Sequence, residues 1–163
     1  MFHVKQYAGI GSRETPKNIL KLMSKISIKL ESDGYTLRSG GAVGADTAFE
    51  CSINDKEIFT ASDATPESIS MAEEFHPTWE HCGQYTQKLH GRNCMIILGN
   101  SLDNPVKFVV CWTSNGKDKG GTGLAIRLAR HHGIRVFNLY DADVRDRFTE
   151  YVGDAKNKGL MLL

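Results

Sequence analysis

The chain has 163 residues, enough for one domain with its own hydrophobic core, and 40% of these residues are hydrophobic. Its formal net charge is only +1, from 20 Lys and Arg against 19 Asp and Glu. A broadly basic nucleic-acid-binding domain has a larger positive excess, so any binding to nucleic acid would depend on a local patch. We expect a single domain over residues 1–163.

The four cysteines form no CxxC pair and do not have the spacing of zinc ligands. Cys94 and Cys111 lie in apolar runs and are expected to be core thiols. The sequence therefore predicts a reducing environment, with neither a metal nor a cofactor. It shows no signal-peptide pattern and no apolar stretch long enough to span a bilayer, which favours a cytoplasmic protein with no membrane partner.

In chain order, the first half alternates strands and helices. A β-like run over residues 4–9 is followed by a helix for which Thr15 is the expected N-cap and Asp33-Gly34 the stop. Apolar residues of this helix recur at helical spacing: Ile19, Leu20, Met23, Ile26 and Leu30. The next expected elements are a strand over 35–38, a helix over 45–53 and a strand over 56–61.

The second half continues this alternation. Its expected elements are helices over 66–74 and 85–98, a strand over 106–112, a helix over 122–132, a strand over 134–139 and a helix over 143–151. Parallel strands covered on both faces are continuously apolar, so the run over 106–112 is expected at the centre of the sheet. Strand–helix alternation repeated about five times predicts a doubly wound, mainly parallel α/β sheet.

Three glycine-rich clusters stand where an expected strand ends and a helix begins. In a doubly wound sheet ligands bind outside the carboxyl ends of the strands, and the free N–H groups of a helix N-terminus suit a phosphate. We therefore expect one shared, nucleotide-sized site. The clusters comprise Gly9, Gly11, Ser12 and Arg13; Ser39, Gly40, Gly41 and Asp46; and Thr113, Gly120, Gly121, Thr122 and Gly123.

Two of these clusters carry side chains with open alternatives. Ser12 and Arg13 either contact a phosphate, with the arginine making a two-pronged contact, or form a tight turn that leaves Arg13 in solvent. Asp46 and Glu50 lie one helical turn apart on the same face. They either complement the helix dipole, or Asp46 accepts hydrogen bonds from a sugar hydroxyl with Glu50 nearby as an acid or base.

The pair Arg92-Asn93 lies in an otherwise apolar stretch and is costly to bury without a partner. A bound phosphate or carboxylate would supply that partner, and an internal ion pair is the alternative. His76, Trp79 and His90 are candidates to frame a base or ribose, although core packing explains Trp79 equally well. An NAD(P) dehydrogenase, a Walker-type nucleotidase and a serine hydrolase are disfavoured because their motifs are absent.

The three glycine-rich clusters, together with Gly91-Arg92-Asn93, resemble the SLOG superfamily. The order and spacing of these motifs match over the part of the chain from Lys5 to Leu139. That superfamily contains the DprA/Smf proteins, the YspA/YpsA-type proteins and the LOG ("lonely guy") phosphoribohydrolases. The Gly-Ala-x-Gly-Ala-Asp element, with the following His-Pro-x-Trp and Arg-Asn, is most similar to the YspA-like branch, often seen in phage genomes. The resemblance implies a Rossmann-like sheet that binds a nucleotide derivative, and a homodimer or larger assembly.

The resemblance also implies two activities. LOG enzymes cleave the N-glycosidic bond of a nucleoside monophosphate with an arginine, which Arg92 matches, and with a glutamate. The segment 124–127, Leu-Ala-Ile-Arg, does not match that glutamate, so Asp46 or Glu50 would have to replace it. DprA proteins bind single-stranded DNA through an element like Arg92-Asn93.

From this we expect a protein that binds a phosphorylated nucleoside derivative (a nucleotide, an ADP-ribose-like compound or a cyclic nucleotide) as a sensor or scavenger. The alternatives are an N-glycosidase that uses Asp46, Glu50 and Arg92, and a protein that binds single-stranded DNA.

Overall fold

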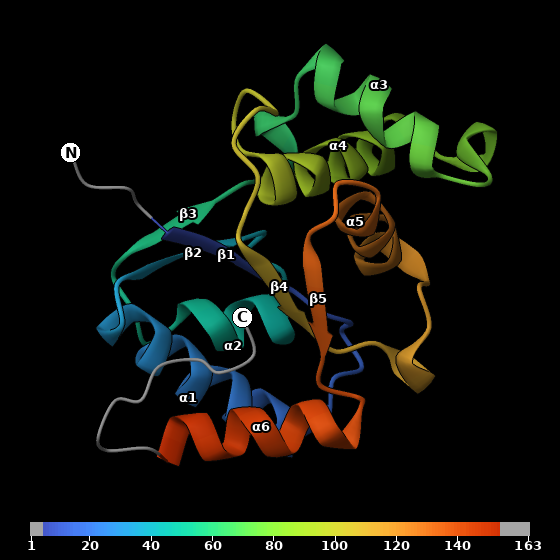
Figure 1. Ribbon diagram of the computed structural model, residues 1–163. Coiled ribbons are helices and arrows are strands. Elements are labelled where there is room, and N and C mark those ends of the chain that lie inside the picture. Colours follow the sequence, from blue (N-terminus) through green and yellow to red (C-terminus); the bar gives the residue numbers. More distant parts are fainter. Residues whose placement is uncertain (1–4, 154–163) are drawn as a thin grey trace.

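The computed structural model describes residues 5–153, which form a five-stranded parallel sheet between two layers of helices (Figure 1). The strands run in the order β3-β2-β1-β4-β5, and each neighbouring pair is parallel. Their bounds are β1 Lys5–Gly9, β2 Tyr35–Ser39, β3 Lys56–Ile58, β4 Phe108–Cys111 and β5 Arg135–Asn138. This confirms the predicted α/β class with a doubly wound, Rossmann-like sheet.

Helices lie on both sides of the sheet (Figure 1): α1, α2 and α6 on one side, and α4 and α5 on the other, with α3 packed on the outside of α4. Their bounds are α1 Lys17–Ser32, α2 Ala45–Glu50, α3 Pro66–Phe75, α4 Gln84–Leu98, α5 Gly120–His131 and α6 Ala142–Gly153. Three single turns of 3₁₀ helix complete the described structure: η1 Ala61–Asp63, η2 Trp79–His81 and η3 Ser114–Gly116. No helix in residues 5–153 has the length and apolar character that crossing a membrane requires.

Two hydrophobic cores follow from the alternation of side chains along the strands. Tyr7 and Phe108 belong to the core under α1, α2 and α6, where their rings stack with centroids 5.7 Å apart. Ala8 and Val109, the next residues of the same strands, belong to the core under α3, α4 and α5. Cys94 and Cys111 are buried in this second core, as expected.

The strand expected at the centre of the sheet, β4, lies one position away from the centre. β1 is the third strand of five, and β4 lies beside it. Both strands are interior and both are covered on two faces by helices, so a continuous apolar run identifies an interior strand without selecting the central one.

Several expected boundaries also differ. Thr15 does not cap α1: its hydroxyl donates to the Ser12 carbonyl at 2.5 Å, and the helix begins at Lys17 after Pro16. α2 and β3 each end three residues early, and a capping box between Thr60 and Asp63 starts η1 instead. α5 begins two residues earlier than expected, so its first turn contains Gly120 and Gly121.

The crevice for a ligand lies at the carboxyl ends of β1 and β4. The chain leaves β1 towards α1 on one face of the sheet and leaves β4 towards α5 on the other face (Figure 1). Such a reversal of winding is the point at which doubly wound sheets bind ligands.

Candidate functional site

A cavity of about 510 Å³ opens at this reversal point. Its walls are the turn after β1, the turn after β2, the start of α5 and one face of α4. Pockets for small ligands commonly measure about 300–1,000 Å³, so a nucleotide-sized molecule fits. Of the residues proposed from the sequence, Gly11, Ser12, Arg13, Asp46, Arg92, Asn93, Gly120, Gly121 and Thr122 line this cavity.

Other residues proposed from the sequence are placed by packing, outside the cavity lining. A side chain at Gly9 would lie 2.6 Å from the Phe49 ring, so this glycine permits close contact between β1 and α2. A side chain at Gly123 would overlap the backbone of Asp118, so this glycine lets the loop pack on α5. Gly41 has a φ of +70°, which a turn after β2 requires and which glycine adopts readily.

Four more of these residues also lie outside the cavity lining. The Ser39 hydroxyl donates to the Gly9 carbonyl at 2.6 Å, and the Thr113 hydroxyl accepts from the Asn138 amide at 2.7 Å. Both bonds join the ends of neighbouring strands. Trp79 packs against the core under α3, α4 and α5. Glu50 has one carboxylate oxygen that is buried without a hydrogen-bond partner among residues 5–153.

Arg92 is anchored by backbone carbonyls. Its Nη1 donates to the carbonyls of Gly40 at 2.8 Å and Phe59 at 3.1 Å, and its Nε donates to the Asn93 side chain at 2.8 Å. Within the described chain no carboxylate forms an ion pair with Arg92, so the alternative of an internal ion pair is not what the structure contains. The Nη2 donors have no hydrogen-bond partner in residues 5–153, and the guanidinium keeps its charge.

Gly40 provides the space that this arrangement needs. A Cβ at position 40 would lie 2.6 Å from Arg92 Nη1 and 2.9 Å from Asp46 Oδ2. Arg92 and Asp46 therefore approach the backbone over a residue that has no side chain. Asn93 links Arg92 to the start of α5, because its side-chain oxygen accepts from Arg92 Nε and its amide donates to the Gly121 carbonyl at 3.3 Å.

We expect Gly40→Ala to displace the Arg92 guanidinium while the fold is kept, because the flexible arginine can yield to the new methyl group. Losing one hydrogen bond of this kind should weaken binding of a nucleoside monophosphate by roughly fivefold to tenfold. Gly83→Ala is the matched control, since a Cβ there meets open space. Calorimetric titration of both variants checks this, and an equal effect of the two substitutions would contradict it.

Asp46 is a buried acid in the first turn of α2, with 6% of its surface exposed. Its Oδ2 accepts the backbone N–H groups of Gly40 at 3.1 Å and Ala42 at 3.4 Å. Burial raises the pKa of Asp46 to about 6, although these hydrogen bonds and the charge of Arg92 act in the opposite direction. Glu50 raises the pKa further. Asp46 is thus an acid whose pKa has moved towards neutrality in a ligand-sized cavity.

The start of α5 supplies backbone donors to the cavity. Lys119, Gly120, Gly121 and Thr122 line it, and no acidic residue occupies the first turn of the helix. The first N–H groups of a helix have no partner within it, and the helix dipole is positive there. Together with Arg92, this end of the cavity suits an anion.

The cavity also includes residues that sequence reasoning did not assign to the site: Ile10, Glu14, Ala42, Thr86, Leu89, Lys119 and Ala125. His76 and His90, which were candidates to frame a base or ribose, line it too. Burial and the nearby charges of His76, Arg127 and Arg92 lower the pKa of His90 to about 4, so its imidazole is neutral at pH 7. The only sequence signal for Lys119 is its place directly before a glycine cluster.

No protein-family model matches the chain, and no curated protein matches it. Among solved structures, DNA processing protein A from Helicobacter pylori has a similar fold, with a TM-score of 0.58 at 16% sequence identity. The match covers 98% of this chain and 78% of that one. This neighbour is a DprA protein, one of the groups that the glycine clusters and Arg92-Asn93 resemble, and the likeness at this identity is one of fold.

Proposed function

We propose that this chain binds a nucleotide unit at the carboxyl ends of β1 and β4. The phosphate lies between the first turn of α5 and Arg92, and the sugar lies near Asp46. The observation that carries this proposal is the state of Arg92, which lines the cavity with its charge unpaired and its Nη2 donors unused within residues 5–153. A phosphate satisfies such donors with charge-assisted hydrogen bonds.

The nucleotide unit has two sources, a free nucleotide derivative or single-stranded DNA. The neighbour from Helicobacter pylori is described by its single-stranded DNA binding mode, which supports the polymer as the source. The cavity lining contributes three cations, Arg13, Lys119 and Arg92, against the two acids Glu14 and Asp46, so it offers cationic side chains locally despite a net charge of only +1 for the chain. Membership of the SLOG superfamily, with assembly as a homo-oligomer, is part of the same proposal.

Thermal unfolding with each candidate ligand tests the proposal and separates the two sources. The probes are AMP, ADP-ribose, cyclic AMP and an oligothymidine strand, each against its phosphate-free nucleoside. A ligand at 100 times its Kd stabilises the fold by about 2.7 kcal/mol. Stabilisation by a mononucleotide supports the small ligand, and none by any phosphorylated probe would overturn the proposal.

The salt dependence of the binding constant then shows whether the protein contacts several phosphates of a DNA strand or a single nucleotide. Binding of a single strand should weaken with a slope of log K against log [salt] of roughly −0.7 for each phosphate contacted. A slope of several units is expected for oligothymidine if several phosphates are bound, and a slope near that of AMP if the cavity holds one nucleotide only.

A second candidate function is hydrolysis of the N-glycosidic bond of a nucleoside monophosphate. Its specific support is Asp46, a cavity-lining carboxyl whose pKa of about 6 suits general acid–base chemistry. Each stabilising ligand is incubated with the protein and its products are separated by chromatography. Release of free base by the wild type but not by Asp46→Asn is the expected result for a hydrolase, and recovery of intact ligand marks a binding protein.

A further inference from the structure

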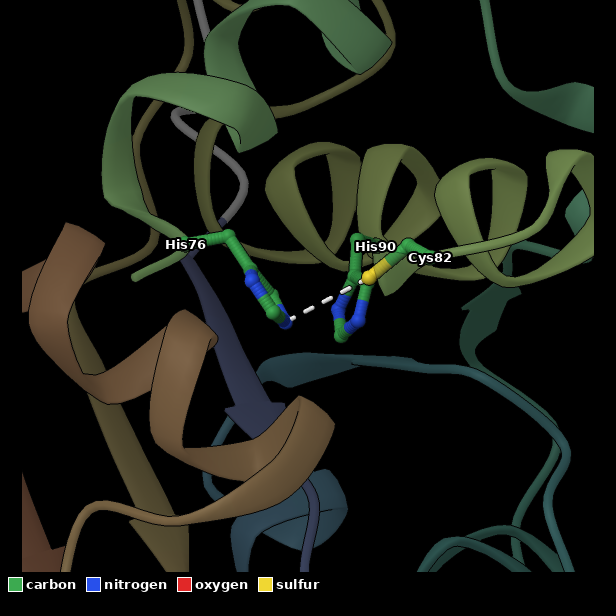
Figure 2. Close-up of side chains that lie close together, drawn as sticks. All are labelled: His76, Cys82 and His90. Carbon is green, nitrogen blue, oxygen red and sulfur yellow. Dashed lines mark hydrogen bonds between the residues drawn. The ribbon is translucent and has the colours of Figure 1, made fainter. Parts of the chain in front are cut away.

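Three potential metal ligands, each beside or within a different helix, lie close together next to the cavity (Figure 2). His76 follows the end of α3, Cys82 follows η2, and His90 lies within α4. One ligand atom from each, a ring nitrogen or the sulfur, lies within 4.8 Å of the other two. The two imidazole rings lie with their centroids 4.6 Å apart and their planes tilted by 59°. Spacings of six and eight residues match no common zinc motif, which is why the sequence did not predict this group.

Two of the three residues have only weak or no contacts at a potential ligand atom: the Cys82 sulfur is 4.0 Å from the Thr78 carbonyl, and one ring nitrogen of His90 has no partner within residues 5–153. His90 has 6% of its surface exposed, and its Nδ1 is buried with no hydrogen-bond partner within the described chain. A buried polar atom without a partner is rare in native proteins and calls for an explanation. The Nε2 of His76 lies 3.7 Å from the Cys82 sulfur, so these two donors already face each other.

We propose that His76, Cys82 and His90 bind a divalent metal ion of the zinc type. Imidazole nitrogen and thiolate sulfur are the ligands that such an ion prefers, and this set contains no hard oxygen ligand that would favour magnesium or calcium. In a tetrahedral zinc site a nitrogen and a sulfur lie about 3.6 Å apart, close to the 3.7 Å observed here. The other ligand pairs, which lie within 4.8 Å, close by up to about 1.5 Å on binding.

Metal binding removes one proton from the site and moves another within it. The Cys82 thiol gives its proton to solvent, because the thiolate is the ligand. His76 Nδ1 now accepts the backbone N–H of Thr78 at 3.1 Å, which places the imidazole proton on Nε2. On metal binding this proton moves to Nδ1, and the Thr78 amide, in an exposed turn, exchanges its bond to His76 for one to water.

The site has three protein ligands and leaves the fourth position of a tetrahedral ion open. Three ligands plus an open position are typical of zinc sites that take water or a substrate, whereas structural sites have four protein ligands. His76 and His90 both line the nucleotide-sized cavity, so an ion held by them lies at the cavity wall. The metal site itself does not depend on the proposed nucleotide function, because its donors are distinct from Arg92 and the start of α5.

Titration of the metal-free full chain with Co²⁺ and Zn²⁺ tests the proposal. We expect one ion per chain, a near-ultraviolet thiolate-to-cobalt charge-transfer band and strong visible bands of a four-coordinate ion. Cys82→Ser should abolish the charge-transfer band, and both Cys82→Ser and His76→Asn should weaken Zn²⁺ binding by at least about 10–100-fold. Neither residue belongs to either of the two hydrophobic cores, and circular dichroism without metal establishes that each variant is folded.

The chain offers matched controls for both residue types. Cys51 is an exposed free cysteine and His81 is an exposed histidine, so Cys51→Ser and His81→Asn should leave the Co²⁺ spectrum and the Zn²⁺ affinity unchanged. The proposal is overturned if wild type and Cys82→Ser bind Zn²⁺ equally, or if Cys51→Ser removes the thiolate band. Because nucleotide is absent from this titration, its failure would leave the proposal on Arg92 intact.

Discussion

Arg92→Ala is expected to weaken binding of a phosphorylated nucleoside by about 10–100-fold, and to change binding of the free nucleoside much less. The reason is that Arg92 lines the cavity without forming an ion pair with any carboxylate in residues 5–153. Its anchoring bonds go to the carbonyls of Gly40 and Phe59 through Nη1, which leaves Nη2 for the ligand. Arg92→Lys keeps the charge but not the planar fork, so an intermediate loss is expected.

The measurement is isothermal titration of AMP and of adenosine against each variant, or of oligothymidine if the polymer proves to be the ligand. Arg147→Ala is the control, because that arginine is exposed on α6, on the opposite side of the sheet. Thermal unfolding separates binding from folding, since Arg92 also joins two loops. An equal loss of affinity for AMP and adenosine would exclude a phosphate contact at Arg92.

Asp46→Asn is expected to stabilise the fold relative to wild type at neutral pH, and to lose that advantage in acid. The pKa of Asp46 is about 6 in the fold, and that of an unfolded aspartate is about 3.9. The folded chain thus holds this proton more tightly, and the contribution of Asp46 to stability is fully present below about pH 4. It is lost as the pH rises through 6, at a total of roughly 2–3 kcal/mol.

Chemical denaturation of wild type and Asp46→Asn from pH 4 to pH 7.5, without added metal, measures this difference. Other titrating groups contribute to both curves, so the difference between them isolates Asp46 and the two charges that face it, Arg92 and Glu50. The free energy of unfolding of wild type minus that of the variant should fall across this range. Parallel curves would show that Asp46 ionises at an ordinary pKa. A fall in stability with rising pH is unusual for a carboxyl group, because most are stabilised by ionisation.

The sequence by itself determined the architecture and the edge of the sheet where the candidate site lies. Alternating strand and helix patterns have periods of two and 3.6 residues, which depend only on near neighbours in the chain. The spacing of Met23, Ile26 and Leu30 predicted the buried face of α1, and these three side chains are fully buried. Glycines after strands marked the carboxyl ends, because short strand-to-helix connections need tight turns there.

The order of the strands and the placement of the helices decided which contacts each residue of these motifs makes. Gly9 and Gly11 are two positions apart in one motif, yet one packs against Phe49 and the other lines the cavity. Likewise the motif Arg92-Asn93 could not reveal that its partners are Gly40, Phe59 and Gly121, from three separate segments.

Only the tertiary structure brought His76, Cys82 and His90 together. Their ligand atoms meet because the chain reverses between α3 and α4, and no local periodicity encodes the distance between residues on the two sides of such a turn. The same holds for Asp46, whose pKa is shifted by burial and by groups in the turn after β2, on α2 and on α4. Local patterns specify elements and their faces, whereas contacts between elements depend on how the whole chain packs.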